Sequence, residues 1–202
     1  IEGWEDGVIK PDKNTLNVLN LQVNNLSKII DDLSTLSLAE SGMLNMNITE
    51  FNLKSETDNI INIFLPRFND NNIKVSNIID DRLFIQYDLQ RFTQIITNII
   101  NNAIIAMDSK ESEISFSTFV KSNKLSLIIS DTGKGISKKD LQNIFERFYR
   151  VDTSRNRNSG GSGLGLSIVK FLIESHKGKI KIKSKLNEGT DVIIDIKDFY
   201  LS

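Results

Sequence analysis

The chain has 202 residues, with 25 lysines and arginines against 26 aspartates and glutamates, and a formal net charge of −1. This length suits one globular core with an accessory element, and the even charge offers no basic stripe for a nucleic-acid backbone, so we expect no nucleic-acid partner. The absence of cysteine excludes disulfides and thiolate metal sites. No apolar run approaches the roughly 18 residues that cross a bilayer, and no signal-peptide pattern opens the chain.

The first predicted element is a long amphipathic helix that begins near Pro11-Asp12, where aspartate can act as the cap. Its apolar residues recur every three or four positions, which predicts a coiled-coil-like seam. The seam consists of Leu16, Leu19, Val23, Leu26, Ile30 and Leu33. We expect the helix to end near Ser41-Gly42, since glycine accepts the left-handed conformation that ends helices. The pattern also allows the seam to lie on the globular core.

The rest of the chain interleaves helices and strands, which predicts an α+β fold with one layer of helices on one face of a sheet. Strands are expected at 48–53, 73–79, 83–86, 113–120, 124–130, 179–184 and 190–196. Helices are expected over 54–68, over a stretch capped by Asp88, over 138–145, and from a glycine-rich stretch to about Ser175.

Two short motifs carry polar groups in positions that suit a ligand. Asn98 and Asn102 are four residues apart on the helix after Asp88, so their amides share one face. Asp131-Thr-Gly-Lys-Gly135 follows a predicted strand, where open sheets tend to bind ligands. Each motif has an ordinary alternative, because asparagine is abundant along the chain and Asp-Thr-Gly is common in turns.

Two further motifs lie closer to the carboxyl terminus. The sequence Phe145-Glu-Arg-Phe-Tyr-Arg150 precedes a polar loop, and the loop ends in Ser-Gly-Gly-Ser-Gly-Leu-Gly-Leu at 159–166. Glycines allow backbone N–H groups to surround an anion, and a following helix adds unpaired N–H groups and a positive dipole end. The stretch therefore indicates a phosphate-binding loop, although alone it could be a flexible linker before a helix.

These four motifs, in this order, resemble the N box, first glycine box, F box and second glycine box of the ATP-binding domain of sensor histidine kinases. That domain has the Bergerat fold shared with gyrase, Hsp90 and MutL. The stretches 145–150, 154–157 and 159–166 are particularly similar to the BaeS-type kinases. The resemblance implies an α/β sandwich in which three helices cover one mixed sheet of about five strands. It also implies two domains, with the second half of a dimerisation and phosphoacceptor hairpin at 1–46 and the ATP-binding catalytic domain at 47–202.

The resemblance implies a role for each matching residue. Asn102 would coordinate a Mg²⁺ ion that bridges the ATP phosphates, beside Asn98. Asp131 would accept a hydrogen bond from the adenine amino group. The phenylalanines would anchor a lid, and Arg147 or Arg150 would neutralise phosphate charge. The full set implied to bind ATP is Asn98, Asn102, Asp131, Gly133, Gly135, Phe145, Arg147, Phe148, Arg150, Gly161, Gly163, Leu164, Gly165, Leu166 and Thr190.

The chain departs from the family pattern after the second asparagine. The family usually has a lysine or arginine and then an aromatic residue where this chain has Ile105 and Ala106. We therefore expect weaker nucleotide binding than is typical, unless Arg150, Arg155 or Arg157 compensates.

The resemblance implies a kinase that transfers the ATP γ-phosphoryl group to a histidine and then to the receiver domain of a response regulator. The one histidine, His176, matches a structural His-x-Gly motif, so we expect it to pack, the phosphoacceptor to be absent, and this chain not to phosphorylate itself. A homodimer through the Leu16–Leu33 helix is also implied. So is a cytoplasmic location, with membrane attachment only through segments absent from this sequence.

Two other functions stay open. A gyrase-like or Hsp90-like ATPase switch uses a carboxylate in its asparagine-bearing helix to activate water, and the absence of Asp and Glu between Thr93 and Met107 argues against it. A dimerisation module with a weak nucleotide site is kept open by Ile105 and Ala106.

Overall fold

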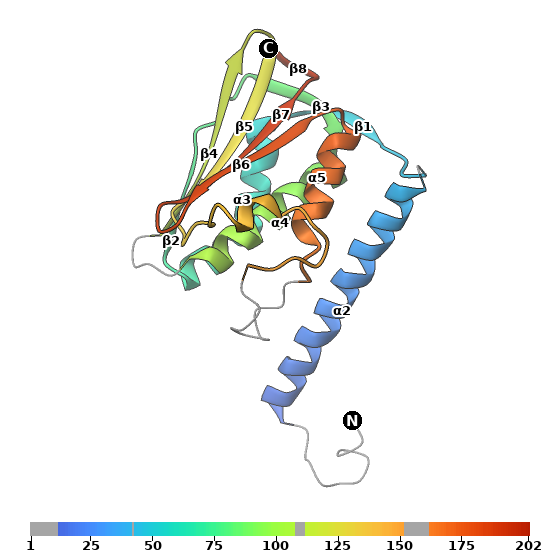
Figure 1. Ribbon diagram of the computed structural model, residues 1–202. Helices are drawn as coiled ribbons and strands as arrows, with labels where there is room; N and C mark the ends of the chain where they lie inside the picture. Colours follow the sequence, from blue (N-terminus) through green and yellow to red (C-terminus); the bar gives the residue numbers. More distant parts are fainter. Residues whose placement is uncertain (1–11, 42, 108–111, 152–161) are drawn as a thin grey trace. The chain divides into compact units, whose positions relative to one another are not determined.

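The computed structural model describes residues 12–41, 43–107, 112–151 and 162–202. Two compact units, Ile1–Met43 and Leu44–Ser202, make up the chain (Figure 1). The sequence predicts a boundary between residues 46 and 47, and the two units divide between Met43 and Leu44.

The first unit contains one helix, α2 (Lys13–Glu40), among its described residues. The predicted cap is confirmed, because the Asp12 carboxylate accepts hydrogen bonds from Thr15 N at 2.7 Å and Thr15 Oγ1 at 2.6 Å. The helix ends at Glu40, and Gly42 lies outside the described residues. Five seam residues expose between 47% and 60% of their surface. They are Leu16, Val23, Leu26, Ile30 and Leu33.

The second unit is built on a five-stranded mixed sheet, which confirms the predicted fold class. Its strand order is β2 (Ile73–Asn77), β4 (Ser112–Lys121), β5 (Lys124–Asp131), β7 (Gly189–Ile196) and β6 (Lys179–Lys185). The β2–β4 pair is parallel and the other pairs are antiparallel. Alternate residues on one face are buried, as the strand period of two requires. They include Ile114, Phe116, Leu125, Leu127, Val192 and Ile194.

Three helices cover the apolar face of this sheet, as predicted (Figure 1). They are α3 (Leu53–Asp70), α4 (Leu89–Ala106) and α5 (Gly165–Ser175). Fully buried side chains from the helices, such as Ile60, Ile96 and Ile168, meet those of the strands in one core. Burial of each large apolar side chain contributes about 1.5–3 kcal/mol, so this core is the main source of the unit's stability.

A second, three-stranded sheet was not predicted. Its order is β1 (Ile48–Asn52), β3 (Leu83–Asp88) and β8 (Phe199–Leu201), with both pairs antiparallel. Strand β8 has only three residues, too few to show an alternating pattern in the sequence. The stacked rings of Phe84 and Tyr200, 5.4 Å apart, help to hold it on β3.

The helix predicted over 138–145 is wrong. Only a 3₁₀ turn, Asp140–Gln142, forms there. Ser137 Oγ donates to the Asp140 carboxylate at 2.6 Å and accepts from Asp140 N at 3.1 Å, so short polar side chains bond locally in place of a longer helical ladder.

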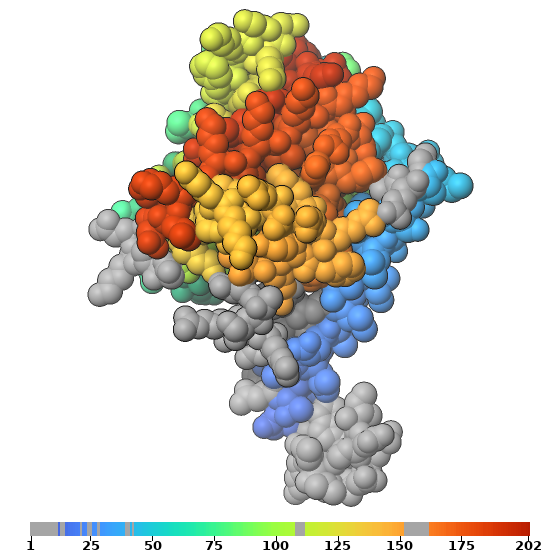
Figure 2. Space-filling view, viewed as in Figure 1, coloured from blue at the N-terminus to red at the C-terminus, as the bar shows by residue number. Residues whose placement is uncertain are grey.

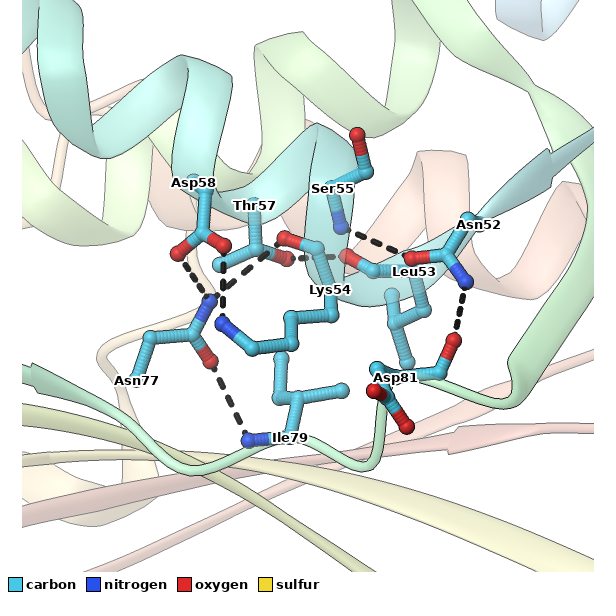
Figure 3. Close-up of polar contacts among 9 residues, drawn as sticks. All are labelled: Asn52, Leu53, Lys54, Ser55, Thr57, Asp58, Asn77, Ile79 and Asp81. Carbon is cyan, nitrogen blue, oxygen red and sulfur yellow. Dashed lines mark hydrogen bonds and ion pairs between the residues drawn. The ribbon is translucent and has the colours of Figure 1, made fainter.

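Several of the abundant asparagines have structural roles at helix ends and turns. Figure 3 shows Asn52, whose Oδ1 accepts from Ser55 N at 2.8 Å and caps α3, and whose Nδ2 donates to Asp81 O. In the same view Asn77 donates to Asp58 at 2.7 Å and accepts from Ile79 N at 3.2 Å, which ties the end of β2 to α3. Asparagine suits such positions because its amide bonds nearby backbone groups.

The junction between β3 and α4 joins three parts of the second unit through Asp88, a residue that is 4% exposed. Its carboxylate accepts from Arg91 N at 3.0 Å, which is the predicted cap, and from Asn47 N at 2.8 Å. Its backbone N–H donates to His176 Nε2 at 3.2 Å. The other ring nitrogen, Nδ1, lies 2.7 Å from Leu172 O, and the ring stacks on Tyr87 with centroids 3.6 Å apart. His176 is therefore a packed residue, as predicted.

These contacts predict a pH-dependent stability. Burial lowers the pKa of His176 below its usual range, and the ring must stay neutral to accept the Asp88 N–H. Because the unfolded chain binds this proton near pH 6.5 and the folded chain only at lower pH, the free energy of unfolding should decrease as the pH falls through about 6.5. Urea unfolding between about pH 7.5 and about pH 5 measures this change.

The His176→Gln variant is the control, and its stability should be nearly flat across the same interval because His176 is the only histidine. Burial raises the pKa of Asp131, which adds stability as the pH falls toward the carboxyl range, and this contribution is common to both proteins. Equal pH dependence in the two proteins would contradict the assignment to His176.

Candidate functional site

The asparagines of α4 lie in different surroundings. Asn98 is 6% exposed, and a methyl group placed on Gly165 would lie 3.3 Å from its Oδ1, so its amide faces the start of α5. Asn102, one turn later, is exposed. Between them, Asn101 accepts from Arg67 Nη1 at 2.6 Å and donates to Thr97 O at 2.8 Å. The helix thus presents one buried and one exposed amide along the face that Asn98 and Asn102 share.

Asp131 is the last residue of β5 and lies opposite Thr190 of β7. Its Oδ1 accepts from Gly133 N at 2.9 Å. Burial raises the pKa of the Asp131 carboxyl, opposed by hydrogen bonds from the Gly133 and Thr190 backbones and reinforced by the nearby Asp191. A partly buried carboxylate with directed backbone donors is a well-placed acceptor for a ligand N–H group.

The first two motifs touch each other through Gly133. A methyl group placed on this residue would lie 2.8 Å from the carbonyl oxygen of Ala106, at the end of α4, and Lys134 N donates to the same oxygen at 2.9 Å. Gly135 has φ +67°, and a side chain there would overlap the carbonyl of Lys185. Close packing therefore requires glycine at both positions, independently of the close ligand approach that the resemblance implies.

Gly189 is a residue of this region that the sequence analysis did not select. It pairs with Lys185 at the β6–β7 turn, has φ +95°, and lies so close to Asp131 that a side chain would overlap the Asp131 carbonyl oxygen. The Asn187-Glu-Gly189 turn was the available signal, but a turn glycine is too common to reveal a contact with a residue 58 positions earlier (189 − 131). Gly189 allows the turn to pack directly beneath the site carboxylate.

The third and fourth motifs are joined through the backbone. Phe148 N donates to Gly163 O at 3.0 Å, and a methyl group placed on Gly163 would lie 2.7 Å from the Phe148 carbonyl carbon. Both residues have positive φ, +63° and +73°. Phe145 is half-buried with Lys170 Nζ 5.5 Å from its ring centre, whereas Phe148 is 65% exposed.

The segment that leads to Phe148 is fixed at both of its ends. Tyr149 OH donates to Asp140 at 2.7 Å, and Ile136 N donates to Ser184 Oγ at 2.8 Å. Figure 2 shows this segment, in yellow to orange, at the surface beside the red β6–β7 hairpin. Arg147 and Arg150 belong to it and have exposed side chains.

The glycine-rich stretch is described from residue 162 onward, so Gly161, Arg155 and Arg157 lie outside the described residues. Leu164 is fully buried and its N–H donates to Ser162 Oγ at 3.2 Å. Helix α5 begins at Gly165, followed by the half-buried Leu166. The stretch thus opens an 11-residue helix whose first N–H groups are available to an anion.

Contacts between neighbours link the four motifs into one site. Gly133 lies against the end of α4, Asn98 against the start of α5, and Gly163 against Phe148. The site combines amide oxygens, a partly buried carboxylate and the N-terminus of a helix, a set that suits a phosphate-bearing ligand with a polar ring. Thr190 is 8% exposed beside Asp131, and its hydroxyl lies 2.9 Å from Ser184 Oγ.

The described residues contain no group of three or more His, Cys, Asp or Glu side chains that could hold a metal ion. An ion at this site would therefore depend on oxygens of the ligand together with an amide oxygen such as that of Asn102. This donor set fits Mg²⁺, which usually binds few protein ligands and the phosphates of its nucleotide.

The chain is similar to known proteins over most of its length. Residues 87–199 match the family model described as histidine kinase-, DNA gyrase B-, and HSP90-like ATPase. The signal transduction histidine-protein kinase BaeS of Escherichia coli K12 is 32% identical over 196 residues, which cover 97% of this chain and 42% of BaeS. The structure of the Acinetobacter baumannii histidine kinase AdeS aligns with a TM-score of 0.81 and 28% identity, covering 98% of this chain and 90% of that chain. The structure of histidine kinase ThkA in complex with response regulator protein TrrA aligns with a TM-score of 0.70 and 24% identity, covering 94% of this chain and 53% of that chain. At this level of identity the similarity supports only the assignment of the fold.

The chain belongs to the histidine kinase-, DNA gyrase B-, and HSP90-like ATPase family, whose model covers more than half of it. Within that family the predicted resemblance to sensor histidine kinases is confirmed by these relatives. The chain spans less than half of the length of BaeS. Among the described helices, none combines the length and apolar character needed to span a membrane.

Gly189 supplies a test of how closely the site is packed. The free energy of unfolding of the Gly189→Ala variant should be lower by about 1–3 kcal/mol, because alanine is strained at φ +95° and its methyl group would overlap the Asp131 carbonyl oxygen. Urea unfolding measures the difference. The control is Gly165→Ala, which should change stability much less because its position is helical and its nearest neighbour atom is 3.3 Å away. Equal stability of the two variants would contradict the packing argument.

Proposed function

We propose that residues 47–202 form the ATP-binding catalytic domain of a two-component sensor histidine kinase. The observation that carries this proposal is the contact of the four motifs around α4 and α5, in a chain whose family is defined by ATPases. In this function the domain binds ATP with Mg²⁺, and the intact kinase transfers the γ-phosphoryl group to a histidine and then to a response regulator.

The proposed roles follow from the surroundings of each residue. Asp131 accepts the adenine amino group, since its carboxylate is held by the Gly133 N–H and lies beside Thr190. The exposed amide of Asn102 binds the Mg²⁺ that the phosphates carry, and the bound ion offsets their negative charge. Backbone N–H groups at the start of α5 hold phosphate oxygens.

The remaining proposed roles concern the segment around Phe148. We assign Phe145 and Phe148 to anchoring this segment at the site, with Arg147 or Arg150 directed at phosphate charge. Support comes from the hydrogen bond between Phe148 N and Gly163 O, which fixes the segment to the glycine-rich stretch. The acceptor histidine of the reaction is not His176, because both of its ring nitrogens are engaged.

An ATPase switch of the gyrase or Hsp90 kind is less well supported. Helix α4 contains neither aspartate nor glutamate, so it offers no carboxylate to activate a water molecule. A module with a weak nucleotide site is the other alternative, since Ile105 places an exposed aliphatic side chain beside Asn102 on α4.

The partners that we propose are a second copy of the chain and a receiver domain. Exposed seam residues along α2, including Leu26 and Ile30, favour pairing of this helix with another. The receiver domain is suggested by the ThkA structure, which contains a response regulator.

Nucleotide binding tests the proposed function. Calorimetric titration with ADP or with a non-hydrolysable ATP analogue, in the presence and absence of Mg²⁺, should show binding that Asp131→Asn abolishes, because the variant removes the charge and replaces one acceptor oxygen by an N–H donor that opposes the adenine amino group. The matched control is Asp198→Asn, since Asp198 is exposed and lies beyond the end of β7. Absence of binding at millimolar nucleotide would contradict the proposal and favour the dimerisation module.

The proposed dimer has a separate test. Sedimentation at tens of micromolar should show association, and Leu26→Glu with Ile30→Glu should abolish it, because charges placed in a helix seam are costly to bury. Asn17→Glu, an exposed change outside the seam, is the control and should associate normally. A monomer in the unaltered chain would contradict pairing through α2.

A further inference from the structure

Arg67, in the last turn of α3, is held against α4 in a defined way. Its Nη1 donates to Asn101 Oδ1 at 2.6 Å, and its guanidinium carbon lies 5.4 Å from the centre of the Phe64 ring. Asn101 is itself oriented, because its Nδ2 donates to Thr97 O at 2.8 Å and so turns its oxygen toward Arg67. The hydrogen bond uses one of the five N–H donors of an exposed guanidinium.

Helix α4 itself provides little positive charge where phosphates would lie. Arg91 is the only charged residue between Leu89 and Ala106, and it belongs to the first turn. The opposite end carries Asn98, Asn102 and the aliphatic Ile105, which is 51% exposed. Amide oxygens carry no positive charge, so any protein cation that contacts a polyphosphate at this end must come from another element.

Helical geometry places Arg67 at this end. Asn98, Asn102 and Ile105 share one face of α4 at intervals of four and three residues. Asn101 is three residues from Asn98 and four from Ile105, so it borders the same face. The guanidinium that bonds Asn101 therefore lies beside the face on the side of Ile105.

We infer that Arg67 is a phosphate-binding residue, which contacts the terminal phosphate of the bound nucleotide from α3. The inference rests on the proposed function of the site. A planar guanidinium suits this task because it can donate to a phosphate while one nitrogen stays on Asn101, and because it is charged at all physiological pH values. Phe64 and Asn101 hold it ready, so less conformational freedom is lost on binding.

Three lysines among the described residues are less suited to this role than Arg67. Lys170 lies over the Phe145 ring, Lys54 is paired with Asp58 at 2.8 Å, and Lys185 is paired with Glu188. A purely structural role for Arg67, as a tie between α3 and α4, is the competing explanation. The two explanations differ in what removal of the charge does to triphosphate and diphosphate binding.

The test is titration of Arg67→Gln with the ATP analogue AMPPNP and with ADP, both with Mg²⁺. We expect AMPPNP to bind about 10-fold more weakly, about 1.4 kcal/mol, and ADP to change less than about 2-fold, because the lost contact is to the terminal phosphate. Ile105→Lys in the Arg67→Gln background should restore most of the AMPPNP affinity, since it returns a cation to the same face. Arg82→Gln removes an arginine that is paired with Asp80 at 2.7 Å and should leave both affinities unchanged.

The outcomes separate the inference from the proposed function. Unchanged AMPPNP affinity in Arg67→Gln, with binding still lost in Asp131→Asn, overturns the role of Arg67 and leaves the proposed function in place. Equal losses for AMPPNP and ADP that Ile105→Lys does not repair show a structural tie and also overturn it. Absence of nucleotide binding in the unaltered chain overturns both.

Discussion

The arrangement of the second unit depends on one buried carboxylate. Asp88 caps α4 through Arg91 N and holds Asn47 N with its other oxygen. A carboxylate at a helix N-terminus satisfies unpaired N–H groups and interacts favourably with the helix dipole, so this side chain fixes where α4 begins. His176 holds the Asp88 backbone from the end of α5. One junction therefore fixes the two helices that carry the asparagine pair and the glycine-rich stretch. It lies at the start of α4 and at the end of α5, and in each helix the motif lies toward the other end.

Close packing positions the backbone that carries the carboxylate of the site, and the Gly133 N–H holds the carboxylate itself. Asp131 ends a strand whose neighbours are β4 and β7, and the carbonyl of Asp131 touches a turn that only glycine can form at this distance. On the other side Gly133 rests on Ala106. Protein interiors are packed as densely as organic crystals, so neither contact has room for an added methyl group. The site is thus held between α4 and the β6–β7 turn before any ligand binds.

Much of this structure could be predicted from the sequence, and the exceptions have physical causes. The long helices and the strands of the main sheet were predicted because their apolar residues repeat with the correct period over many residues. The helix predicted over 138–145 does not form, because short polar side chains bond each other locally. Strand β8 was not predicted, because it is too short to show an alternating pattern. The order of motifs predicted four segments that the structure brings into contact, whereas the contacts of Gly189 with Asp131 and of Arg67 with Asn101 were missed because they join residues distant in the chain. No local pattern marks such residues.

The position of β8 has a consequence for how the second unit folds. Strand β3 lies between β1 and β8, so the strand that leads into α4 has its full set of partners only when residues 199–201 are in place. The main sheet has the same property, because β5 lies between β4 and β7. Contacts between residues so far apart in sequence close large loops before they contribute energy, which slows folding. Completion of both sheets, and of the β5–β7 pairing that places Asp131 opposite Thr190, therefore depends on the strands that residues 189–201 form.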